Sequence, residues 1–165
     1  PIAQELGLKG AVAIPFKGDI ADAQIAEWVK AIGNSKPDMF INHGSAGLYQ
    51  KLVTQSKAAG LKTTFMCVNS GSSQIAKGLG PLAEGMVFAQ VVPSPWARKI
   101  EIAREYQEAV RKVDPKAEFS YGSLEGYMTA KALTMSLRAT GKNLTRARWL
   151  ETMSNAKFDL GTYQF

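Results

Sequence analysis

The chain has 165 residues, enough for one domain with a buried core, and its 45% hydrophobic and 21% charged residues are ordinary for a globular protein. The net charge is +6, but the 20 Lys and Arg residues are spread along the chain, without the dense basic stripe typical of nucleic-acid binders. We therefore expect solvated helix faces and no nucleic-acid partner. No apolar run comes near the roughly 18 residues of a membrane span, no export signal is visible, and the single Cys67 excludes an internal disulfide.

The chain opens with the expected end of a helix over residues 1–6, closed by Gly7, followed by a strand over residues 10–16. Asp19 or Asp22 is placed to cap the next helix. That helix carries apolar residues at helical spacing on one face: Ile25, Trp28, Val29 and Ile32.

The middle of the chain alternates between strand and helix patterns. Strands are predicted over residues 37–43, 61–68 and 84–92, and helices over residues 45–58 and 73–79. Together with the first strand and helix, this order predicts an α/β fold: a parallel sheet of four strands with flanking helices on both faces.

Small polar residues follow two of these strands, where open α/β sheets place their ligands. The candidate ligand-binding residues are His43, Gly44, Ser45, Ala46, Asn69 and Ser70. Simpler structural roles stay open, because Ser45 also suits a helix N-cap and Asn69 a turn. His43 is the only histidine and has no Cys near it, so a metal site is not expected.

The second half of the chain predicts helices without strands of their own. Ser94 and Pro95 predict the start of a helix that runs to Val113, residues 121–140 predict a second helix, and Thr145 caps a third. Amphipathic helices need a partner layer, so these must pack on each other, on a partner chain, or on a sheet outside this sequence.

Six short motifs occur in one order along essentially the whole chain. They are Pro37-Asp38-Met39-Phe40, Gly60-Leu61-Lys62-Thr63 with Phe65-Met66, Glu84-Gly85-Met86, Val91-Val92-Pro93-Ser94-Pro95-Trp96, Ser120-Tyr121 with Leu124-Glu125-Gly126-Tyr127, and Phe158-Asp159-Leu160-Gly161. Their order and spacing resemble the periplasmic solute-binding proteins of ABC importers, in the class that binds branched-chain amino acids (leucine, isoleucine and valine).

The resemblance implies two α/β lobes joined by three crossovers, with solute held in the cleft between them. Residues 1–92 would be most of the second lobe, residues 93–160 the helices that return to the first lobe, and residues 161–165 the start of the final crossover. The first lobe's opening strands, an export signal and the final strands would lie outside this sequence. The implied function is periplasmic or extracytoplasmic capture of a solute for an ABC permease, with no reaction, cofactor or metal.

The sequence departs from the leucine-binding pattern at two cleft positions. By the resemblance, Gly44-Ser45-Ala46 stands where leucine binders place aromatic residues, and Asn69 stands where they place a glutamate that pairs with the ligand's ammonium group. A neutral Asn cannot supply a charge-assisted bond to a cation, whereas free amides at a helix start favour a carboxylate. We therefore expect an organic acid or amino acid-like solute rather than leucine itself.

Two other functions stay open at this point. A solute-sensing receptor domain of the same fold would bind a similar ligand and transmit a hinge motion. A Rossmann-like enzyme fits less well, because no Gly-rich phosphate turn follows a strand, and Gly44-Ser45-Ala46-Gly47 is offset by one from a hydrolase elbow. For this chain by itself we expect weak or no solute binding, and self-association that covers its apolar helices.

Overall fold

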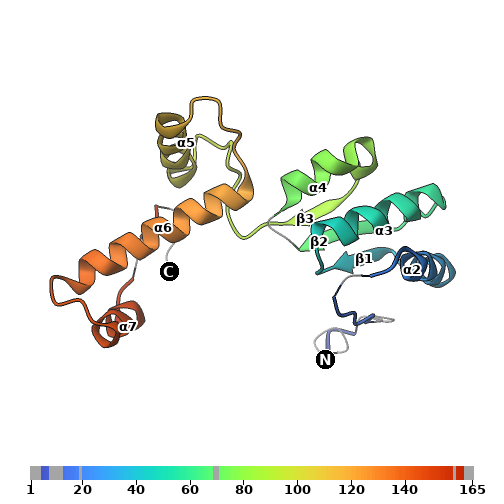
Figure 1. The fold of residues 1–165 in the computed structure, drawn as a ribbon, viewed down its shortest axis with the longest axis horizontal. Helices are drawn as coiled ribbons and strands as arrows, with labels where there is room; N and C mark the ends of the chain where they lie inside the picture. The colour runs from blue at the N-terminus through green and yellow to red at the C-terminus, as the bar shows by residue number, and fades with distance from the viewer. Residues whose placement is uncertain (1–4, 8–12, 19, 69–70, 158, 162–165) are drawn as a thin grey trace.

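The structure is a computed structural model that describes residues 5–7, 13–18, 20–68, 71–157 and 159–161. Within these ranges a three-stranded parallel sheet of order β1-β2-β3 is followed by a group of helices (Figure 1). The elements are α2 (Asp22–Ser35), β1 (Met39–Asn42), α3 (Ala46–Ala58), β2 (Thr64–Val68), α4 (Ser72–Leu79), the 3₁₀ helix η1 (Gly80–Ala83), β3 (Val87–Ala89), α5 (Glu101–Val113), α6 (Tyr121–Thr140) and α7 (Arg146–Asn155). The prediction of a parallel α/β sheet with flanking helices is confirmed.

The strand predicted over residues 10–16 is not seen in the part that the structure describes. Residues 13–16 form no strand and are exposed to solvent. Pro15 cannot donate to a sheet ladder, and an exposed segment gains no burial to hold it on the sheet. The described sheet therefore has three strands rather than four.

Two predicted helix starts are also wrong in detail. Ala21 is the N-cap of α2 and no side chain caps it, while the Asp22 carboxylate pairs with Lys51 Nζ at 2.8 Å; Asp19 lies outside the described residues. The helix predicted from Ser94 begins only at Glu101, after a series of turns. There the Pro95 carbonyl accepts a 2.7 Å hydrogen bond from Gln107 Nε2, and the chain turns before the helix can begin.

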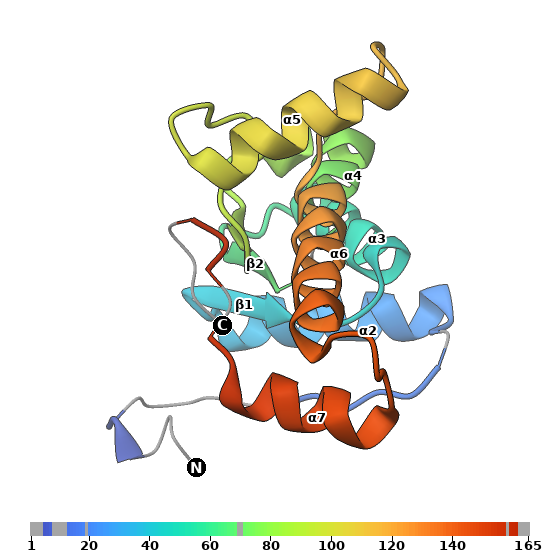
Figure 2. The ribbon, with the colours of Figure 1, turned by 90° about the vertical axis from the view of Figure 1, so that its left-hand side faces the viewer.

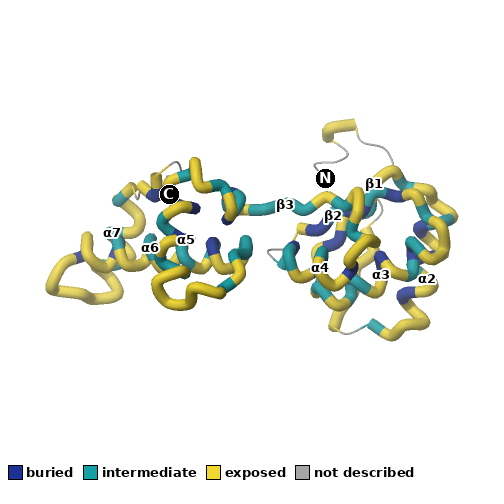
Figure 3. Tube along the Cα trace, turned by 90° about the horizontal axis from the view of Figure 1, so that it is seen from above, coloured by how far each residue is buried: buried dark blue, intermediate teal, exposed yellow. Residues whose placement is uncertain are grey.

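One face of the sheet carries the first hydrophobic core. Phe65 and Cys67 of β2 are buried against α2, α3 and α4, all of which lie on the same side of the strands (Figure 3). The buried residues of this cluster are Ile25, Val29, Ile32, Tyr49, Leu52, Val53, Phe65, Cys67, Ile75 and Leu79.

The opposite face of the sheet is not covered by any described helix, contrary to the expectation of helices on both faces. Ile41, Met66 and Val87 lie side by side across the three strands, and Ile41 is 59% exposed. Met39 and Val68 on the same face are exposed as well. A parallel sheet is normally covered on both faces, so this apolar surface lacks its second layer.

The helices α5 and α6, with Leu160, form a second core whose buried residues are Ile102, Tyr106, Leu124, Met128 and Leu160. Helix α7 lies across the C-terminal end of α6, where Trp149 Nε1 donates a 2.8 Å hydrogen bond to Ser136 Oγ (Figure 2). The predicted bounds of α6 and the Thr145 cap of α7 are confirmed. None of the described helices is long and apolar enough to span a membrane.

Candidate functional site

The carboxyl ends of the three strands meet at one edge of the sheet. Asn42, the last residue of β1, pairs in register with Cys67, and Val68, the last residue of β2, pairs with Ala89 at the end of β3. The last residues of these strands therefore lie next to one another, at the edge where open parallel sheets bind ligands.

Four of the predicted ligand-binding residues follow β1 at this edge. His43 and Ser45 are exposed, while Gly44 and Ala46 are half-buried. Ser45 is the N-cap of α3, and its Oγ accepts a 3.3 Å hydrogen bond from the Leu48 amide. The structural role predicted for Ser45 is therefore confirmed, and its ligand contact stays a prediction. Asn69 and Ser70 lie outside the described residues.

The turn after β1 also brings in a residue from far earlier in the chain. A Cβ placed on Gly44 would lie 2.8 Å from Phe16 Cζ and 3.1 Å from Asn42 Oδ1, so the ring and the amide are neighbours. The Phe16 ring also contacts Trp28, with ring centroids 5.8 Å apart. Phe16 thus places an aromatic ring at this edge of the sheet, which was not predicted from the sequence. Because Gly44 has no side chain, it leaves room for that ring.

Three buried polar atoms at this edge have no hydrogen-bond partner among the described residues. They are Asn42 Nδ2, Ser72 Oγ and Gln90 Nε2. Asn42 ends β1 and is 6% exposed, Ser72 begins α4 and is 4% exposed, and the half-buried Gln90 directly follows β3. Buried polar groups are nearly always paired, so three unpaired ones at one edge require an explanation.

Sequence reasoning missed these three residues, although each stands out in a simple way. Asn42 and Gln90 are polar residues within apolar strand patterns, and Ser72 lies three residues before the buried Ile75 on the same face of α4. The signal available in the sequence was a polar residue at a position that the hydrophobic pattern predicts to be buried.

Tyr49 and Cys67 lie beneath this edge in the first core, and neither is a catalytic candidate. Burial raises the pKa of Tyr49, and the nearby Cys67 adds to the shift. Burial also raises the pKa of the Cys67 thiol, which keeps it protonated and unreactive at neutral pH. Among the described residues no group of three or more His, Cys, Asp or Glu residues could hold a metal ion.

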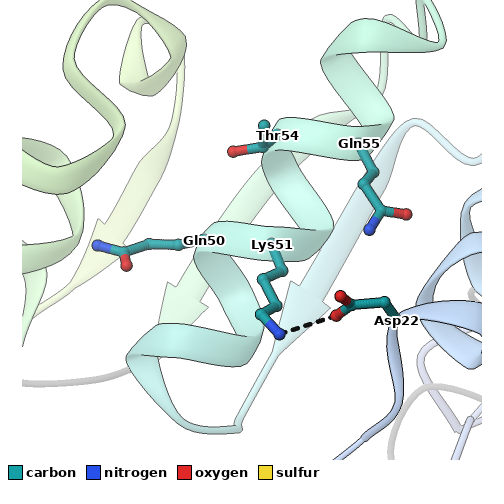
Figure 4. Close-up of a pocket in the computed structure, with 5 residues that line it drawn as sticks. All are labelled: Asp22, Gln50, Lys51, Thr54 and Gln55. Carbon is teal, nitrogen blue, oxygen red and sulfur yellow. Dashed lines mark hydrogen bonds and ion pairs between the residues drawn. The ribbon is translucent and has the colours of Figure 1, made fainter.

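Two surface hollows lie elsewhere on the molecule. One, of about 260 Å³, is lined by Asp22, Gln50, Lys51, Thr54 and Gln55, and the Lys51–Asp22 ion pair crosses it (Figure 4). The other, of about 350 Å³, lies on α6 and is lined by Tyr127, Ala130, Lys131, Thr134, Met135 and Arg138. Neither contains a predicted site residue, so the candidate site is an open edge of the sheet rather than either hollow.

Comparison with known families agrees with this architecture. The family model described as "periplasmic binding protein" matches residues 2–164, nearly the whole chain. The chain belongs to the periplasmic binding protein family. Proteins of this family bind small-molecule ligands. No curated protein matches the chain.

Solved structures of two ligand-binding proteins share the fold. A possible leucine/isoleucine/valine-binding protein from Rhodopirellula baltica SH 1 aligns with a TM-score of 0.69 and 28% identity, over 74% of this chain and 34% of that one. An extracellular ligand-binding receptor from Verminephrobacter eiseniae ef01-2 aligns with a TM-score of 0.73 and 21% identity, over 87% of this chain and 42% of that one. The chain therefore spans less than half the length of each structure.

Proposed function

We propose that this chain is part of an extracytoplasmic solute-binding protein of an ABC importer, which binds a small organic acid or amino acid-like solute. The observation that carries the proposal is the carboxyl edge of the sheet, where Asn42, Ser72 and Gln90 hold buried polar atoms without partners. Family membership supports a binding role. Similarity to the possible leucine/isoleucine/valine-binding protein from Rhodopirellula supports an amino acid-like ligand.

In this proposal the solute bridges two lobes and holds them closed. Residues 1–92 contribute one lobe's edge of the cleft, and residues 93–160 return to the other lobe. The connection after β3 leads from the sheet to the helical group, so its backbone would take up the rotation as the lobes close (Figure 1). No covalent bond is made or broken, and an ABC permease is the expected partner.

The turns at the edge favour a carboxylate but not the ammonium group that leucine also carries, so they favour an organic acid over leucine. The α3 N-terminus next to Ser45 offers amide donors and the positive end of the helix dipole, which attract a carboxylate. Asn69 supplies no charge for an ammonium group. His43, Gly44, Ser45, Ala46, Asn69 and Ser70 are the residues proposed to face the solute.

Isothermal titration calorimetry of the whole protein with leucine, aromatic acids and their amides tests this function. We expect a carboxylic acid to bind more tightly than leucine. Tight leucine binding would defeat the proposed solute class, and failure of every solute to bind would defeat the function. A complex with a permease rather than with a signalling domain would distinguish an importer component from a sensory receptor of the same fold.

A further inference from the structure

The unpaired groups at the carboxyl edge lie on the same face of the sheet. Asn42 pairs in register with the buried Cys67, which pairs with Phe88, and Gln90 follows Phe88 by two residues. Because side chains alternate along a strand, Asn42 and Gln90 extend to the same side as Cys67. Ser72 faces that side too, because it lies one helical turn before Ile75 of the first core.

These groups are mainly hydrogen-bond donors. The Nδ2 of Asn42 and the Nε2 of Gln90 are amide donors, and the Oγ of Ser72 can donate or accept. Asn42 is more than nine-tenths buried, so water does not freely replace a missing partner. A group that satisfies both amides must offer hydrogen-bond acceptors.

The residues around these amides indicate whether the ligand group that meets them is an anion or a cation. None of residues 40–46, 71–76 or 87–95 is Asp, Glu, Lys or Arg, so these segments offer no anion to an ammonium group. The helices α3 and α4 both begin at this edge and direct the positive ends of their dipoles toward it. A carboxylate satisfies the donors and gains from both dipoles, whereas a cation gains from neither.

An apolar side chain adjoins Asn42. Phe16 lies beside Gly44 and Asn42, and its ring contacts Trp28. A solute with an apolar body can lie against Phe16 while its head group reaches Asn42.

We propose that Asn42 and Gln90, assisted by Ser72, form the carboxylate-binding part of this lobe, and that the ligand is a carboxylic acid with an apolar body. The inference rests on the proposed solute-binding function and adds residues that the turn positions did not identify. The Asn42 and Gln90 amides donate to the carboxylate oxygens, and Phe16 contacts the apolar body.

Nuclear magnetic resonance titration of the ¹⁵N-labelled whole protein, of which this chain is a part, tests this with benzoate as the probe and benzylamine as the cationic counterpart, at constant ionic strength. The side-chain amide signals are assigned from the spectra of Asn42→Asp and Gln90→Glu. Each variant lacks the pair of NH₂ signals of the residue that was replaced. We expect benzoate to shift both pairs of signals in a saturable manner and benzylamine to leave them unchanged. Signals that do not respond to benzoate, or that respond equally to benzylamine, would overturn the inference.

Variants give a second, independent readout. Gln90→Glu replaces a donor by a carboxylate and should weaken benzoate binding about tenfold or more. Gln90→Leu removes the donor without adding charge and should also weaken binding, which keeps the test valid if Gln90→Glu fails to fold. Gln55→Glu makes the same charge change at the hollow on α3 and should leave binding unchanged. If Gln90→Glu, Gln90→Leu and Gln55→Glu all bind benzoate with the same affinity, the inference is overturned. If the whole protein binds amines but not acids, the solute-binding function stands and only this assignment fails.

Discussion

Gln107 of α5 donates a 2.7 Å hydrogen bond through Nε2 to the carbonyl oxygen of Pro95, and both residues are buried. This contact ties the segment that leaves the sheet to the first helix of the helical group. Gln107→Leu leaves the Pro95 carbonyl buried without its partner, which should destabilise the helical group by about 1–3 kcal/mol. Amide hydrogen exchange in α5 and α6 measures the loss. Gln24→Leu on α2, an exposed position, is the control and should change little.

Ser45 should contribute to stability through its cap of α3. Ser45→Ala removes the acceptor for the Leu48 amide and should cost about 1 kcal/mol in the free energy of unfolding, measured with urea. Ser45→Thr keeps a hydroxyl acceptor and should retain most of that stability. Equal losses in the two variants would show that the cap hydrogen bond is not the cause.

Removing the hydroxyl group from each of two buried tyrosines should change the free energy of unfolding in different directions. The Tyr49 hydroxyl has no partner among the described residues, so Tyr49→Phe should be neutral or stabilising by up to about 1 kcal/mol. The Tyr106 hydroxyl bonds to Ser123 and accepts from the Ser120 amide, so Tyr106→Phe should cost about 1 kcal/mol. Thermal and urea unfolding of both variants, side by side, measures the difference.

Tyr49 should also make the protein less stable at alkaline pH. Its pKa is raised in the folded state, so the unfolded chain loses this proton at a lower pH than the folded chain. The free energy of unfolding should therefore fall as the pH rises through the ordinary tyrosine pKa of about 10. Tyr49→Phe should flatten that part of the stability–pH curve. An unchanged slope would assign the alkaline loss to other groups.

The uncovered apolar surfaces predict self-association of the 165-residue chain. Its accessible surface is 11466 Å², whereas a compact monomer of its 17.9 kDa mass would expose about 8,000 Å². Obligate interfaces bury on the order of 2,000–5,000 Å² in total, about half of it on each partner, so the difference exceeds what one such interface needs from this chain. Because one part of the chain offers a bare sheet face and another offers exposed helix residues such as Leu133 and Leu150, a second copy can supply each missing layer.

Size-exclusion chromatography with light scattering measures this association. Ile41→Lys places a charge at the centre of the open sheet face and should shift the population toward monomer. Val113→Lys makes the same change at an equally apolar position at the end of α5 and should have no effect. A monodisperse wild-type monomer with well-protected amides in residues 97–155 would contradict the prediction.

The elements that sequence predicted well are those whose ends are marked by local chemistry. Ser45, Ser120 and Thr145 each accept a hydrogen bond from the amide three residues on, and Gly141 ends α6 with a positive φ. These contacts lie within one turn of helix, so the sequence pattern contains them. Ser94 carried the same local signal, a hydroxyl side chain at an expected N-cap, but no helix begins there. Instead the Pro95 carbonyl accepts a tertiary hydrogen bond from Gln107.

The candidate site was predicted only in part, for a similar reason. Parallel strands place their carboxyl ends together, so the turn after β1 could be located from order alone. The position of Phe16 beside Gly44 depends on a contact between residues far apart in sequence. Whether Asn42 finds a partner in the folded chain depends on the same long-range packing, which periodicity does not describe.

The two hydrophobic clusters share no buried residue, and Figure 3 shows them in separate parts of the molecule. Cooperative melting depends on contacts that make each half of a protein need the other. In a single copy of this chain, the calorimetric heat-absorption profile should therefore split into two peaks, one for each cluster.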